Sequence, residues 1–157
     1  MKFTVIKSLQ KDSAMSLILR SFLLFISLYL LSDIFVMHTS FGITPQALKT
    51  TLFGDETLYI DPINEASFLE FWHTQIFIVM MLLLTLSSIF IRVANRSRII
   101  ITNVVMLSAL VSLVALPLAF YLSNFFIHIY IVTYFLWHFT ALYMIFYSFW
   151  KLHARSV

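Results

Sequence analysis

The sequence contains no cysteine, only two glycines and few charged residues. Without cysteine the chain can form no disulfide, can hold no cysteine-ligated iron–sulfur cluster and can attach no c-type haem covalently. Gly42 and Gly54 lie in one stretch, and they form neither a Gly-rich phosphate-binding loop nor a GxxxG helix-contact motif. Thiol chemistry is therefore excluded, and nucleotide binding is disfavoured.

Apolar residues dominate what is present. Of the 157 residues, 61% are hydrophobic and 11% are charged, whereas an average soluble domain is about half apolar and roughly a quarter charged. Such an apolar excess has to face a lipid bilayer rather than water. The composition predicts an integral membrane protein.

Four apolar stretches are long enough to cross a membrane, which takes about 20 residues per helix. They run over residues 14–37, 71–91, 99–122 and 125–150. The first is too long for a signal-peptide core, and no cleavage site of small residues follows it, so it is read as an uncleaved anchor. We expect a single all-α domain over residues 1–157, built as a four-helix transmembrane bundle.

The charges are sorted between the two ends of these stretches. Every Lys and Arg except Lys49 lies before the first stretch or at its start, between the second and third, or after the fourth. The outer loop, residues 38–70, holds five acids: Asp55, Glu56, Asp61, Glu65 and Glu70. Because Lys and Arg accumulate on the cytoplasmic side, both termini are predicted to be cytoplasmic, in a bacterial inner membrane. The net charge of +3 then reports orientation, and no nucleic-acid partner is needed to explain it.

The outer loop contains signals for its own helix. Thr44 suits an N-cap, Pro45 the first helical position and Gly54 the position after the last turn, which predicts a helix of about nine residues. Its apolar face is expected to rest on the outer membrane surface, and it comprises Ile43, Ala47, Leu48, Thr51 and Leu52. Ser67 and Glu70 have the spacing of a capping box that starts the second span.

Five histidines are the main chemical resource of the chain. His38, His73 and His128 lie near the outer ends of three different spans, and His138 lies about 15 Å deeper than His128. Imidazole is a good ligand for haem iron, zinc or copper. We predict His73 and His128 as axial ligands of haem b or of another metal, with His38 as a third metal ligand and His138 as a further cofactor contact.

Two acids accompany these histidines. Glu70 shares a helix face with His73 and could orient it. A di-iron centre is disfavoured, because it would need a second Glu-x-x-His and more carboxylates, and the third and fourth spans contain no acid. Asp33 lies inside the first span, where it either pairs with a residue such as His73 or His128 or extends to the outer surface.

Two further side chains inside the spans need an explanation. His138 is expected to bond to a hydroxyl, a backbone carbonyl or a cofactor; the hydroxyl candidates are Ser108, Ser112 and Thr85. Arg20 is expected to extend to the cytoplasmic surface.

Residues 125–150 include twelve Phe, Tyr or Trp residues, which could flank a macrocycle or a quinone ring or could face the core and lipid.

The sequence contains no recognisable catalytic motif, so a stand-alone enzyme is not the favoured interpretation. The leading hypothesis is a redox subunit that binds haem b near the outer face and exchanges electrons with quinone. The alternative is a non-catalytic accessory subunit that joins other membrane subunits or a second copy. A proton channel ranks third, because the polar groups form no continuous line.

Overall fold

The fold consists of five helices, seen in a computed structural model that describes residues 13–94 and 99–153. They are α1 (Ser13–Ser40), α2 (Pro45–Phe53), α3 (Glu65–Val93), α4 (Ile99–Tyr121) and α5 (Phe125–His153). All except α2 are long and apolar enough to cross a membrane. The predicted four-helix bundle with a short helix in its first loop is confirmed.

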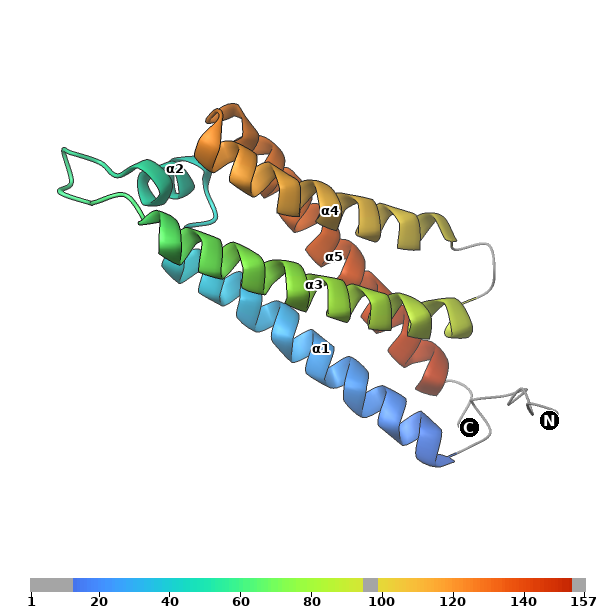
Figure 1. The fold of residues 1–157 in the computed structure, drawn as a ribbon. Helices are drawn as coiled ribbons and strands as arrows, with labels where there is room; N and C mark the ends of the chain where they lie inside the picture. The colour runs from blue at the N-terminus through green and yellow to red at the C-terminus, as the bar shows by residue number, and fades with distance from the viewer. Residues whose placement is uncertain (1–12, 95–98, 154–157) are drawn as a thin grey trace.

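The four long helices run side by side, and α2 lies across one end of the bundle (Figure 1). We call this end the loop end, and the end where α1 starts and α5 finishes the terminal end. Helix α5 runs diagonally through the bundle and contacts each of the other helices. Of the four long helices, α1 has the smallest share of residues buried inside the bundle.

The start of α2 matches the sequence prediction, but the start of α3 does not. The Thr44 side chain accepts a hydrogen bond from the Ala47 amide, and Gly54 follows α2 with a φ of 77°. The N-cap of α3 is Asn64, whose side chain accepts from the Ser67 amide. Ser67 is therefore the third helical residue and not the cap, so the capping-box prediction was wrong. The helix starts earlier because Asn64 already satisfies a free amide of the first turn.

The apolar face of α2 packs against the bundle. Leu48 and Leu52 are almost fully buried, and α2 contacts α5. The Thr51 hydroxyl donates to the Phe41 carbonyl at 3.1 Å, and the Thr51 carbonyl accepts from the Ile63 amide at 3.0 Å. The expectation that this face rests on the membrane surface is therefore corrected, because its two leucines complete the core at the loop end.

Helix α4 contains Pro117, which disrupts the normal hydrogen-bond ladder. Proline has no amide hydrogen, so the carbonyl four residues earlier, that of Leu113, loses its helical donor. The indole of Trp72 on α3 donates to this carbonyl at 2.8 Å. The proline thus creates an acceptor that ties α3 to α4.

Arg20 joins the terminal ends of α1 and α5. Its guanidinium Nη2 donates to the carbonyl of Leu152 at 2.7 Å, one residue before α5 ends. Carbonyls of the last helical turn lack helical donors, and a cation is favoured there. Arg20 therefore extends toward the terminal end, as expected, and caps α5 there.

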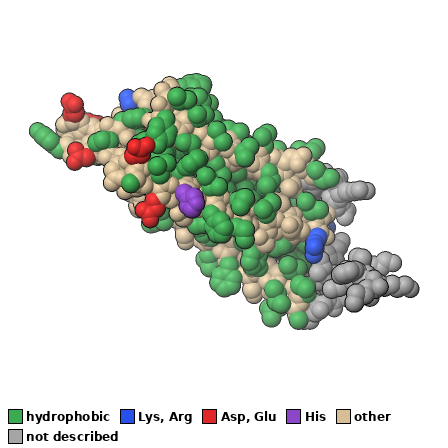
Figure 2. Space-filling view, viewed as in Figure 1, with side chains coloured by type: hydrophobic (Ala, Val, Ile, Leu, Met, Phe, Trp, Pro, Cys, Tyr) green, Lys and Arg blue, Asp and Glu red, His purple; other side chains and the backbone are tan. Residues whose placement is uncertain are grey.

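Apolar side chains cover the outside of the bundle as well as its core. Figure 2 shows a broad hydrophobic surface, with acidic side chains gathered at the loop end. Exposed large residues include Leu17 and Phe25 on α1, Leu107 on α4, and Phe139 and Phe146 on α5. Such a surface is stable only against lipid or an apolar partner.

Candidate functional site

Asp33 and His138 point into the core of the bundle. On α1 the buried residues Leu23, Ile26, Leu30, Asp33 and Met37 recur with helical spacing, so the carboxyl lies on the helix face that meets the other helices. His138 belongs to the corresponding face of α5 and is completely buried, while Asp33 is 7% exposed. An acid and an imidazole so deeply placed need partners.

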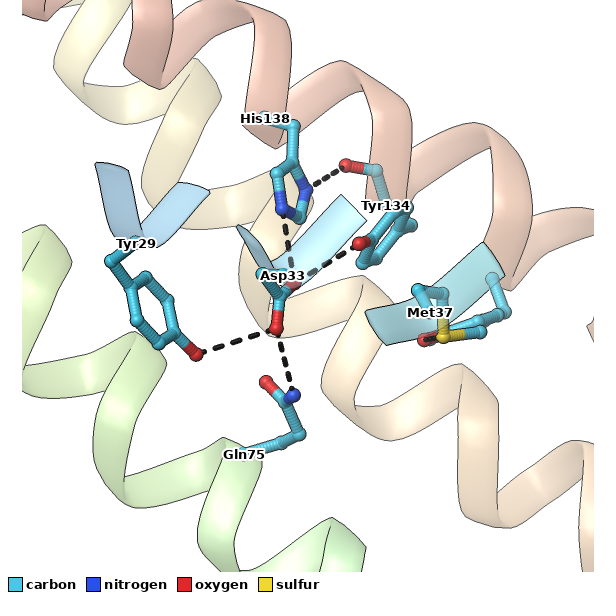
Figure 3. Close-up of polar contacts among 7 residues, drawn as sticks. Tyr29, Asp33, Met37, Gln75, Tyr134 and His138 are labelled. Atoms are coloured by element: carbon cyan, nitrogen blue, oxygen red, sulfur yellow. Dashed lines mark hydrogen bonds and ion pairs between the residues drawn. The ribbon is translucent and has the colours of Figure 1, made fainter. Parts of the chain in front are cut away.

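The two side chains are each other's partners. His138 Nε2 lies 3.1 Å from Asp33 Oδ2, and His138 Nδ1 lies 2.9 Å from the backbone carbonyl of Tyr134 (Figure 3). A carbonyl oxygen only accepts, so Nδ1 carries a hydrogen. The Nε2–Oδ2 contact then needs one further proton, because without it two acceptors would face each other. This proton makes either an imidazolium beside a carboxylate or a neutral imidazole beside a carboxylic acid, and the pair is neutral overall in both forms.

Three other side chains complete the shell around Asp33. The Tyr134 hydroxyl donates to Oδ2 at 3.0 Å, the Gln75 amide donates to Oδ1 at 3.1 Å, and the Tyr29 hydroxyl lies 3.4 Å from Oδ1. Figure 3 shows these groups converging on the carboxyl from α1, α3 and α5. They replace the hydrogen bonds that water would otherwise give. We call these five residues the Asp–His cluster: Tyr29, Asp33, Gln75, Tyr134 and His138.

The structure brings together only two of the residues singled out from the sequence, Asp33 and His138. The other candidates, His38, His73, His128 and Glu70, have exposed side chains outside the Asp–His cluster. His73 and His128 share outward faces with exposed apolar residues, such as Phe77 on α3 and Val132 on α5. Within residues 13–94 and 99–153, no three His, Asp or Glu side chains group as metal ligands.

The expected partners of the two buried residues are corrected in part. Asp33 bonds to His138 rather than to His73 or His128. For His138 the expected backbone carbonyl is confirmed, that of Tyr134, but the side-chain partner is Asp33 rather than a hydroxyl of Ser108, Ser112 or Thr85. Counting from the loop end of each helix, Asp33 lies seven residues in and His138 thirteen residues in. Helix α5 crosses behind α4 and α3 (Figure 1), so positions counted along separate spans do not share a common depth.

Tyr29, Gln75 and Tyr134 were missed at the sequence level, although signals for them exist. Tyr29 and Tyr134 each precede a buried ionisable residue by four positions, which places them on the same helix face. Gln75 is an amide within an apolar span, where a polar side chain needs a partner.

Together, the apolar surface and the four long helices define an integral, multi-pass membrane protein in contact with the lipid bilayer. A family model described as a transmembrane helical domain, Aq_1264_TM, matches residues 42–156, and the chain belongs to this family. The match covers α2 to α5, and α1, which supplies Asp33, precedes it. No curated protein and no solved structure matches the chain.

Proposed function

We propose that the Asp–His cluster is a proton-exchange site inside the membrane and that the protein moves protons through it. The sequence alone ranked a proton channel third, but it did not bring these five polar side chains into one buried cluster. The observation that carries this proposal is the contact between His138 Nε2 and Asp33 Oδ2, which holds one exchangeable proton between two groups that can both accept it. Ionisable residues within transmembrane segments mark proton and ion pathways in general. In this proposal the protein lies in a bacterial inner membrane with both termini in the cytoplasm.

The composition of the site favours exchange over a purely structural role. Apolar residues of similar size would pin α1 to α5 at least as well, because the cost of removing two charges from water often exceeds their attraction. Unlike an apolar pair, an acid–imidazole pair has two protonation states of similar geometry. Tyr29 adds a hydroxyl that is only half-buried and can pass a proton to the carboxyl.

Proton flux into proteoliposomes tests the proposal. A potassium gradient with valinomycin sets the membrane potential, and a pH-sensitive dye inside the vesicles reports proton entry. Asp33→Asn and His138→Gln are each expected to lower the flux by about 100-fold, the order that positioned acid–base groups contribute to proton transfer. Glu70→Gln and His128→Gln are the matched controls, since they make comparable chemical changes at exposed positions. Wild-type flux equal to that of empty vesicles would refute the proposal.

Haem ligation by His73 and His128 is a separate proposal. Their exposed side chains would require a haem outside the core, held between this chain and a partner subunit or a second copy. An absorption spectrum of the purified protein, with and without dithionite, tests for a Soret band.

A further inference from the structure

A hairpin closed by hydrogen bonds projects from the loop end. Asp55 and Ile60 exchange two backbone hydrogen bonds of 2.9 and 3.1 Å. The Asp55 carboxylate accepts from the Thr57 hydroxyl at 2.6 Å and from the Thr57 amide at 2.9 Å. These two bonds lower the pKa of Asp55, the hydroxyl more than the amide, so the acid stays ionised at neutral pH. We call residues 55–60 the loop-end hairpin.

The tip of the loop-end hairpin is apolar and exposed. Leu58 is 62% exposed and Tyr59 is 96% exposed. Tyr59 also has a φ of 53°, a conformation that costs a non-glycine residue free energy. The turn closed by Asp55 and Ile60 thus presents a large aromatic side chain to water.

The geometry argues against lipid as the partner of this tip. In Figure 1 the loop between α2 and α3 extends beyond the loop end, away from the helices that span the membrane. Asp55 and Glu56 precede the tip and Asp61 follows it. These carboxylates would be repelled by anionic lipid headgroups. A second copy is equally unfavourable there, because the loop end of any copy is acidic.

We propose that the loop-end hairpin is a recognition element for a different protein, whose surface carries an apolar pocket rimmed by Lys or Arg. Tyr59 would fill the pocket, since tyrosine provides a large contact area with few rotatable bonds and is enriched among residues that dominate binding energy. The neighbouring acids would pair with the basic rim and steer association. The hairpin is distinct from the Asp–His cluster, so this proposal does not depend on proton exchange.

The first measurement decides whether the side chain at position 59 lies in lipid or in water. The natural chain has no cysteine, so Tyr59→Cys and Phe139→Cys each create a single site for a nitroxide label. In lipid nanodiscs, the label at 59 should be relaxed by a water-soluble nickel chelate, whereas the label at 139 should be relaxed by oxygen dissolved in the bilayer. Equal oxygen relaxation at both positions would overturn the proposal.

The second measurement identifies the partner in cells. Benzoylphenylalanine replaces Tyr59 in the full-length protein expressed in its own host, and the same replacement at Phe139 is the control. We expect one saturable protein adduct at position 59 and lipid adducts at 139. Glu56→Gln with Asp61→Asn should lower the yield by roughly tenfold, which corresponds to about 1.4 kcal/mol of binding energy. Crosslinks at 59 only to lipid, only to a second copy, or to nothing would overturn the proposal.

Discussion

His138 is held in the core by hydrogen bonds at both of its ring nitrogens. Its ring is completely buried, and its two nitrogens are used by the Asp33 carboxyl and the Tyr134 carbonyl. Removing the carboxyl would leave Nε2 in the core without a partner, and the donors from Tyr134 and Gln75 would lose their acceptor as well. One substitution therefore disrupts several hydrogen bonds at once.

We expect Asp33→Leu to lower the free energy of unfolding by about 3 kcal/mol, because breaking one side of a buried pair leaves the other side uncompensated. His138→Leu should have an effect of similar size. The double variant Asp33→Leu/His138→Leu should be clearly more stable than the sum of the single effects predicts. Unfolding in mixed detergent and SDS measures these differences. Strictly additive effects would mean that the two side chains do not interact.

Pro117 and Trp72 show how one helix compensates for a defect in another. The proline leaves the Leu113 carbonyl without its helical donor, and Trp72 supplies a donor from α3. The position of the proline was visible in the sequence, but nothing local to α4 indicates which helix would satisfy the free carbonyl. The answer depends on the register in which α3 packs against α4.

This pairing predicts a coupling between the two positions. In the natural background, Trp72→Phe should cost about 1 kcal/mol of stability, the usual worth of a hydrogen bond. In a Pro117→Ala background the backbone gains an amide hydrogen at this position that can bond to the Leu113 carbonyl, so the same Trp72→Phe change should cost much less. The four free energies of unfolding form a double-mutant cycle. An equal cost in both backgrounds would rule out the proposed compensation.

The bundle separates its charges along its length. Asp55, Glu56 and Asp61 lie at the loop end, whereas Arg92 and Lys151 lie near the terminal end, with apolar helix surface between them. Because α1 starts and α5 finishes at the same end, the start of α1 and the end of α5 lie on the same side of the membrane. The basic end is predicted to be cytoplasmic.

Single cysteines test this orientation without background labelling, because the natural chain has none. In spheroplasts, whose inner membrane is intact, Glu56→Cys should react with a membrane-impermeant maleimide. Lys151→Cys should react only after the membrane is opened. The opposite pattern would show that the termini lie outside.

The number and the approximate bounds of the helices follow from the sequence, because a bilayer demands about 20 apolar residues per crossing and few charges inside. The helix at Pro45–Phe53 was likewise predictable, since its cap signals are local to Thr44, Pro45 and Gly54. Local rules could not choose between two good caps at Asn64 and Ser67, because each can satisfy the first turn.

The Asp33–His138 pair was decided by tertiary structure. The two residues are 105 positions apart, and they meet because α1 packs against α5 and both helices turn these faces inward. The same rotation of α3 and α5 about their axes turns His73 and His128 outward. Helix rotation and tilt are set by the packing of all the neighbouring side chains together, so the depth of a residue along its own span cannot reveal its partner.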